Sequence, residues 1–251
     1  MALLNPLHLK AVVAIGTLDK RKRFVCTATG FLVGFLAKNS KDPAKRAYYI
    51  FLLTNRHVFE GKDGVHLRFN MRNGKSEIVP QALKFPNKEL RWLAHPNKKV
   101  DLALLNVNPQ VLVEHGIDYI FFNEETFAYQ RNFDRIGVTV GDETFILGFP
   151  MGFAGVAQNF PYAKTGIISR FDRELLRSKK AFLIDSSIFP GNSGGPVILK
   201  PTNTALANTK AVSSAYLLGA VTGYLPSRED LWTHQTPPPT VVRLEREHSG
   251  R

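Results

Sequence analysis

Short segments rich in β-branched and aromatic residues recur along the chain, and clusters of Gly, Pro, Asn, Asp or Lys separate most of them. Regular short strands bounded by turn residues favour an all-β sandwich or barrel, and helical periodicity is scarce. A mixed polar and aromatic stretch lies near residues 107–134, with expected strands in similar number on both sides. The expected strands lie within residues 10–16, 23–35, 48–58, 64–70, 101–107, 143–150, 165–171, 181–187, 195–200 and 217–224.

This midpoint predicts the domain organisation. The chain has 251 residues, which suits one or two closely packed domains. We predict an N-terminal β-barrel over residues 1–115, an inter-barrel linker over 116–134 and a C-terminal β-barrel over 135–251.

The cysteine content and the opening sequence bear on the cellular compartment. Cys26 is the single cysteine, so no disulfide can form within the chain. The apolar runs are too short to cross a bilayer, and "MALLNPLHLKAVVAIG" indicates a first strand rather than a secretory signal. A disulfide-free chain without an export signal is typical of a reducing cytosol. We therefore expect a cytoplasmic protein with no membrane partner.

The chain is strongly basic, with a formal net charge of +12. Such an excess favours acidic partners, for example nucleic acid or an acidic protein surface. A solvated basic surface without a partner is the alternative. The basic residues form only short clusters, "KRKR" at 20–23 and "RSKK" at 177–180, which we expect at hairpin tips.

Three polar residues occur in the chain order histidine, aspartate, serine. His57 ends the apolar run "FLLTNRH", Asp101 opens "DLALL", and Ser193 lies in "PGNSGGP". A serine hydroxyl needs a base at hydrogen-bond distance to become a nucleophile, and histidine suits this role because its ordinary pKa lies near neutrality. A carboxylate can then fix the imidazole tautomer and stabilise the imidazolium. On a double barrel the spacing puts the first two in one barrel and Ser193 in the other, so we expect the site in the cleft between them.

The glycines around Ser193 have a chemical interpretation of their own. Attack on a carbonyl produces an oxyanion, which requires preorganised donors. The backbone N–H groups of Gly191 and Ser193, linked by Asn192, can supply them if the turn curls so that both point inward. A hairpin turn without chemistry is the alternative interpretation of the same residues.

Together these motifs resemble the trypsin/chymotrypsin-like serine peptidase superfamily. "TATGFLVG", "TNRHV", "DLALL", "VGDETFILGFP", "TGIISR" and "IDSSIFPGNSGGPV" occur in the order of its disulfide-free bacterial branch, which includes HtrA proteases and stand-alone trypsin-like peptidases. The resemblance covers roughly residues 10–225. It implies two six-stranded antiparallel β-barrels. It also implies an acyl-enzyme mechanism with His57 as general base, Asp101 as orienting carboxylate, Ser193 as nucleophile and Gly191 with Ser193 as oxyanion hole.

The chain departs from the family pattern at two places. Asn192 stands where digestive relatives carry an Asp that pairs with a newly cut N-terminus, so activation by such a cleavage is not expected. No PDZ-like domain follows the peptidase motifs. The sequence ends in "VVRLEREHSGR", a strand-like start that stops abruptly, so we expect a truncated C-terminal end or a further module.

The resemblance also places the substrate-binding residues. Ser187, six residues before Ser193, falls at the family's pocket floor, and because it is not an Asp a preference for Lys or Arg is not expected. Thr222, Gly223 and Tyr224 would pair with the substrate backbone as an added strand. Tyr224 would narrow the pocket entrance. The resemblance thus implies small or medium apolar P1 residues.

Other chemistry has little support in the sequence. The seven histidines show no HxxxH or HxH spacing, so with one cysteine we expect no metal site. Phosphate-loop and dinucleotide fingerprints are absent, and we expect no cofactor. The expected partner is a protein or peptide substrate, and the sequence does not indicate an oligomeric state. The alternative function is a catalytically silent, protease-like binding module for nucleic acid or an acidic protein.

Overall fold

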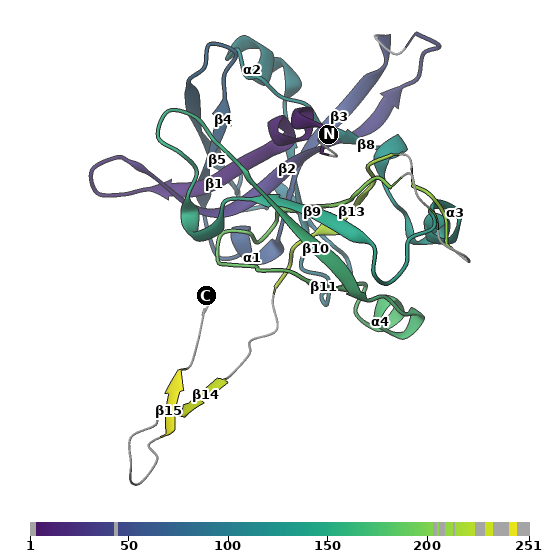
Figure 1. The fold of residues 1–251 in the computed structure, drawn as a ribbon. Coiled ribbons are helices and arrows are strands. Elements are labelled where there is room, and N and C mark those ends of the chain that lie inside the picture. The colour runs from purple at the N-terminus through teal and green to yellow at the C-terminus, as the bar shows by residue number, and fades with distance from the viewer. Residues whose placement is uncertain are drawn as a thin grey trace.

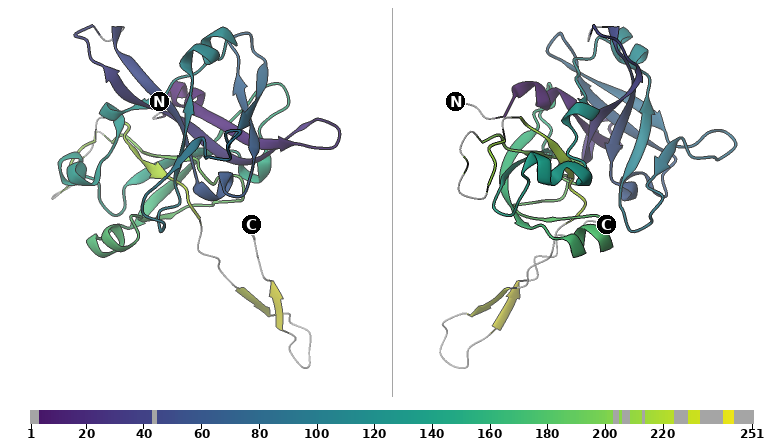
Figure 2. Two further views of the ribbon diagram at one scale, coloured as in Figure 1. Left: turned by 180° about the vertical axis from the view of Figure 1, so that it is seen from behind. Right: turned by 90° about the vertical axis from the view of Figure 1, so that its right-hand side faces the viewer.

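The computed structural model describes residues 4–42, 45–202, 205, 209–212, 214–223, 229–232 and 241–244. The main regular structure is β: two curled sheets, one from each half of the sequence, pack against each other (Figure 1). This is the double β-barrel architecture of chymotrypsin-like proteins, so the predicted all-β fold class is confirmed. Figure 2 shows the two sheets from behind and from the side.

The first sheet has eight strands, in the order β5-β4-β1-β2-β3-β7-β6 with β8 paired to β2. All neighbours are antiparallel except β8, which runs parallel to β2. The strands are β1 (Val12–Leu18), β2 (Phe24–Lys38), β3 (Ala47–Thr54), β4 (Gly64–Asn70), β5 (Ser76–Ala82), β6 (Trp92–Ala94), β7 (Ala103–Val107) and β8 (Phe122–Asn123).

The second sheet has five strands among the described residues, in the antiparallel order β11-β10-β9-β12-β13. The strand numbers therefore differ from six per barrel, partly because β8 comes from the predicted linker and joins the first sheet. A separate two-stranded sheet pairs β14 with β15. The strands are β9 (Glu143–Gly148), β10 (Tyr162–Arg170), β11 (Leu183–Asp185), β12 (Pro196–Leu199), β13 (Leu217–Ala220), β14 (Glu229–Trp232) and β15 (Val241–Leu244).

Short helices connect the strands. They are η1 (Pro6–Ala11), α1 (Arg56–Phe59), α2 (Pro109–Glu114), η3 (Glu124–Thr126), η4 (Gln130–Asn132), α3 (Phe133–Ile136), η5 (Pro150–Gly152) and α4 (Arg173–Ser178). Within the described residues, no helix has the length and apolar character needed to cross a membrane. The domain boundaries proposed at 115 and 134 stay predictions.

The beginning of the chain differs from the expected first strand. Residues 6–11 form η1, and β1 begins only at Val12. The side chain of Asn5 accepts a hydrogen bond from the N–H of Leu7 at 3.0 Å, and Pro6 occupies the first helical position. An Asn cap followed by Pro favours a helical turn because these residues satisfy or remove the free amides of the first turn.

The two basic clusters lie in different settings. Residues 20–23 form the tip of the β1–β2 hairpin, as expected, and this hairpin projects from the body of the molecule (Figures 1 and 2). Residues 177–180 lie instead at the end of α4 and just beyond it, in the connection from β10 to β11. Because β10 and β11 pair antiparallel, this cluster also lies in a hairpin connection, but the connection contains a helix that the Asp172 side chain caps by accepting from the Leu175 N–H.

Alternate residues of β1 and β2 pack into two different hydrophobic cores, one inside the first barrel and one between the two sheets. Val13, Ile15 and Leu32 belong to the interior of the first barrel. Their sequence neighbours on the opposite strand faces, such as Ala14 and Phe31, pack between the two sheets against residues of β9 and β12. Because side chains alternate along a strand, a strand buried on both faces must be apolar throughout. The shared core fixes how the barrels meet and therefore where residues from both halves come together.

Candidate active site

His57 projects from the one-turn helix α1, directly after β3. The strand ends at Thr54, and the chain turns at Asn55 into the helix. Val58 and Phe59 are buried in the core of the first barrel and anchor the helix there. The His57 side chain is half exposed, so one edge of the ring faces solvent.

Asp101 contacts His57 through both carboxylate oxygens. Its Oδ2 lies 2.6 Å from His57 Nδ1, and its Oδ1 accepts the backbone N–H of His57 at 3.1 Å. Asn55 holds the segment before β7 by donating from Nδ2 to the Asp101 carbonyl at 2.9 Å. Two contacts from one carboxylate fix the ring orientation. With the Nδ1 proton donated to Asp101, Nε2 is the nitrogen of the neutral ring that can accept a proton.

The electrostatic surroundings favour an ionised Asp101. Burial alone would raise its pKa, but the hydrogen bonds from the side chain and backbone of His57 outweigh burial and hold the pKa below its usual range. The charge of Arg56 acts in the same direction. The carboxylate is therefore negative at neutral pH, as stabilisation of an imidazolium requires.

The turn that carries Ser193 lies against β2 and the end of β3 in the first barrel. The Ser193 carbonyl accepts the N–H of Thr29 at 2.9 Å. A Cβ at Gly194 would lie 2.1 Å from the Thr29 carbonyl oxygen and 2.3 Å from Thr54 Oγ1, so only glycine fits there. Thr54 precedes His57 by three positions. These contacts bring Ser193 to the junction of the barrels beside α1, although no hydrogen bond of the described residues joins its hydroxyl to the imidazole.

The hydroxyl of Thr29 fixes the backbone two residues before Ser193. Thr29 is fully buried, and its Oγ1 donates to the Gly191 carbonyl at 2.6 Å and accepts the Phe149 N–H at 3.1 Å. Gly191 has φ of +93°, and a Cβ there would lie 2.3 Å from the Phe149 carbonyl oxygen. Both the left-handed backbone and the close approach require glycine.

The peptide unit between Pro190 and Gly191 is oriented by Met151. The Pro190 carbonyl accepts the N–H of Met151 at 2.6 Å. In a trans peptide the C=O and N–H point in opposite directions, so the Gly191 N–H points away from Met151. Within the described residues, this N–H donates to no other group.

The peptide unit between Asn192 and Ser193 is oriented in a similar way. The carbonyl of Asn192 accepts the N–H of Gly195 at 2.9 Å, which turns the N–H of Ser193 away from that contact. The Ser193 N–H likewise donates to no group in the part of the chain that the structure describes. Asn192 itself is buried, and its Nδ2 has no partner among the described residues. Two amides on either side of a buried residue are thus left available to a ligand.

Ser187 lies exposed in the loop between β11 and Gly191. Its carbonyl accepts a hydrogen bond from Lys164 Nζ at 2.7 Å, and the same ammonium lies 4.1 Å from the ring centroid of Phe189. Desolvation lowers the pKa of Lys164. Lys164 could not be identified from the sequence, because nothing in the pattern of β10 indicates which loop its side chain reaches.

The segment expected to pair with substrate follows β13. Two backbone hydrogen bonds join Val221 to residues 194–195, from the Gly194 N–H to its carbonyl at 2.8 Å and from its N–H to Gly195 at 2.9 Å. Thr222 and Gly223 come next and are exposed. Tyr224 lies outside the described residues. Thr222 therefore directly follows Val221, the residue that pairs with the Ser193 turn.

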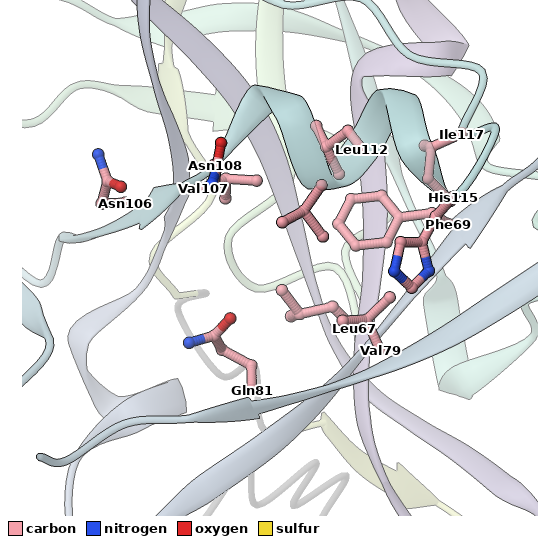
Figure 3. A pocket seen from close by; sticks show the side chains of 11 residues that line it. Leu67, Phe69, Val79, Gln81, Asn106, Val107, Asn108, Leu112, His115 and Ile117 are labelled. Carbon is pink, nitrogen blue, oxygen red and sulfur yellow. The ribbon is translucent and has the colours of Figure 1, made fainter.

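An apolar cavity of about 200 Å³ lies elsewhere in the first barrel, between β4, β5 and α2 (Figure 3). It adjoins residues 106–108, at the opposite end of β7 from Asp101, and is therefore separate from the His57–Asp101 pair. Its lining includes Leu67, Phe69, Val79, Leu112, His115 and Ile117. Among the described residues, no group of three or more His, Cys, Asp or Glu is placed to hold a metal ion.

Comparison with known families gives one match. A family model described as a trypsin-like peptidase domain matches residues 28–207, a span that includes His57, Asp101 and Ser193. The match covers more than half of the chain, and the chain belongs to this family of trypsin-like peptidase domains. Membership supports a general function as a peptidase that acts on peptides or proteins. No curated protein matches the chain.

Proposed function

We propose that this protein is a serine endopeptidase with Ser193 as nucleophile, His57 as general base and Asp101 as orienting carboxylate. The observation that carries the proposal is the pair of contacts from Asp101 to His57, at 2.6 Å on Nδ1 and 3.1 Å on the backbone N–H. This arrangement leaves Nε2 as the atom that takes the proton of an attacking hydroxyl. The contacts of the Ser193 turn with Thr29, together with the position of Gly194 against the end of β3, support its approach to the same junction.

The proposed reaction proceeds through an acyl-enzyme. The Ser193 oxygen bonds to the substrate carbonyl carbon while its proton passes to His57 Nε2, and the carbonyl π electrons move to the oxygen. The amides of Gly191 and Ser193, separated by Asn192, then donate to this oxyanion. The C–N bond breaks as the imidazolium protonates the leaving amine. Water then attacks the carbonyl carbon of the acyl-enzyme while its proton passes to His57 Nε2. The bond from this carbon to the Ser193 oxygen breaks, the imidazolium returns the proton to Ser193, and the carboxylic acid product is released. We expect the bond between Ser193 and His57 to form in the substrate complex, because catalytic hydrogen bonds often tighten there.

Substrate is proposed to bind as an added strand along Thr222 and Gly223, which are exposed and follow the Val221 contacts. Ser187 carries no acidic side chain, and Tyr224 is proposed to restrict the pocket, so we propose small or medium apolar P1 residues. Profiling cleavage sites by mass spectrometry in a digested lysate tests this preference. A majority of cuts after Lys or Arg would contradict it.

Active-site labelling tests the proposed function directly. A fluorophosphonate should label the wild type, and Ser193→Ala should abolish the label together with cleavage of unfolded protein substrates. Thr209→Ala, a change outside the proposed site, serves as the control that should still be labelled. If the folded wild type neither labels nor cleaves a broad panel of substrates, the function as a silent, protease-like binding module is supported instead.

Two smaller proposals concern the cellular compartment and an acidic partner. Burial raises the pKa of Cys26 to about 12, which keeps this single thiol neutral and unreactive. A chain without disulfides fits the cytoplasm and the disulfide-free bacterial branch of the superfamily. The net charge of +12 supports an acidic partner, so retention on heparin should fall steeply with salt. Elution together with a neutral protein of the same fold would contradict an electrostatic interaction.

A further inference from the structure

The connection from β9 to β10 belongs to the second half of the chain but is attached to the first barrel. It comprises residues 149–161 and runs across to β4 (Figure 1). Several of its large side chains are exposed, and Val156 is 100% exposed. Its buried residues between 153 and 160 are only Ala154 and Asn159. Apolar burial therefore contributes little to its conformation, and polar contacts must hold it.

Arg68 of β4 provides the main polar contact. Its side chain donates from Nη1 to the Gly155 carbonyl at 2.8 Å and from Nη2 to the Val156 carbonyl at 2.7 Å. Its Nε donates to Ser76 Oγ at 2.9 Å. Arg68 is only 6% exposed, and within the described residues no carboxylate pairs with it. A buried guanidinium is costly unless its donors are satisfied, so these two loop carbonyls are required partners.

A second attachment lies beside the first. Asn70 and Asn159 exchange two hydrogen bonds, from the Asn159 N–H to Asn70 Oδ1 at 2.7 Å and from Asn70 Nδ2 to the Asn159 carbonyl at 2.9 Å. The Asn159 side chain also donates to the Arg68 carbonyl at 2.6 Å. Arg68 and Asn70, two residues apart on the face of β4 opposite to the core residues Leu67 and Phe69, thus hold both ends of the segment 155–159.

The other end of the same connection orients the proposed oxyanion turn. Met151 donates its N–H to the Pro190 carbonyl, the contact that turns the Gly191 N–H the other way. Met151 has φ of +53°, a conformation that is costly for a residue with a Cβ. Such a conformation persists only when the surrounding structure imposes it. The attachment at residues 155–159 is four to eight residues away and limits how far this backbone can relax.

We propose that Arg68 is a positioning residue for catalysis, which holds the β9–β10 connection on the first barrel so that Met151 keeps the Gly191 N–H directed at the oxyanion. The proposal rests on the proposed function as a serine endopeptidase. On this proposal, the direction of the Gly191 N–H depends on the contact of Arg68 in the first barrel with the β9–β10 connection of the second half of the chain. Arg68 touches neither the substrate nor the reacting atoms, and it acts through the connection.

The test compares Arg68→Ala with Arg68→Lys and with Arg91→Ala, a control at an exposed arginine of the first barrel. For Arg68→Ala we expect kcat to fall by roughly 10- to 100-fold, less than the loss from deleting an oxyanion donor outright, with KM changed by less than about threefold. Binding of a peptide boronate, which mimics the tetrahedral state, should weaken in parallel with kcat. Arg68→Lys should be intermediate because an ammonium cannot span two carbonyls. Guanidinium ion at sub-denaturing concentration should restore part of the kcat of Arg68→Ala and none of that of Arg68→Lys.

The outcomes distinguish failure of the proposed function from failure of the role of Arg68. A wild type without Ser193-dependent labelling overturns the proposed function and this inference with it. An active wild type with unchanged kcat in Arg68→Ala overturns only the role of Arg68. A general loss of stability, with kcat, KM and boronate binding affected alike and no response to guanidinium, also overturns it. If Arg68→Ala does not fold, the same measurements on Arg68→Lys decide, because wild-type kcat and boronate affinity there contradict the proposal.

Discussion

Replacing Thr29 by valine removes one hydroxyl and keeps the shape of the side chain. Thr29 has no solvent exposure, and its Oγ1 is the hydrogen-bond partner of the Gly191 carbonyl at 2.6 Å and the Phe149 N–H at 3.1 Å. The substitution leaves one buried acceptor and one buried donor unpaired. Each unsatisfied buried polar group costs about 1–3 kcal/mol, so we expect Thr29→Val to lower the free energy of unfolding by about 2–6 kcal/mol.

Equilibrium urea denaturation measures this loss, with Thr29→Ser as the matched control. Serine keeps the hydroxyl and removes one methyl group, which should cost only about 1 kcal/mol. Activity should separate the two variants further, because a displaced Gly191 misdirects the N–H proposed to bind the oxyanion. If the unfolding free energies of Thr29→Val and wild type agree to within about 0.5 kcal/mol, the hydroxyl does not hold the turn and the reasoning is refuted.

Three further predictions concern Asp101 and the Ser193 turn. Asp101→Asn should lower kcat by roughly 10⁴-fold, measured with a peptide substrate, because an amide can hold the imidazole in the wrong tautomer; comparable activity would remove Asp101 from the mechanism. Since the folded-state pKa of Asp101 lies below its usual value, its contribution to stability is fully present above pH of about 4 and is lost as the pH falls through the folded pKa. The stability difference between wild type and Asp101→Asn should therefore shrink between pH 7 and pH 3 in urea titrations, and a constant difference would contradict this linkage. Gly194→Ala should destabilise far more than Gly74→Ala, because φ is +82° and +81° at the two sites but only Gly194 has backbone within 3 Å of the added Cβ. Equal thermal shifts in the two variants would show that the turn can move aside.

Ten of the strands could be predicted from the sequence because their signals are local, whereas β5, β6 and β8 were not among the expected strands. Turn residues bound each apolar run, and runs such as that of β2 are apolar on both faces because the strand serves two cores. The motifs around His57, Asp101 and Ser193 also stand out locally, and the family to which they point is confirmed by the match over residues 28–207. Their catalytic roles stay predictions. The helical turn η1 was missed because an Asn cap and Pro6 outweigh the strand pattern that follows.

The contacts that hold the candidate site could not be predicted. Thr29 meets Gly191 across 162 positions, and Arg68 meets Gly155 across 87. Nothing near either residue distinguishes it from an ordinary strand threonine or a surface arginine. The helix α4 shows a related limit, since the basic cluster predicted a hairpin connection but not the helix within it.

By itself, the sequence determined the β-rich fold class and the order of the three polar side chains. These properties depend on side-chain alternation, on turn residues and on the intrinsic chemistry of each residue, all of which act over a few positions. The tertiary structure alone decided which carbonyl the Thr29 hydroxyl and the Met151 N–H meet, and therefore the direction of the Gly191 amide. The physical reason is that a hydrogen bond depends on distance and angle between groups that the packing of the two barrels brings together.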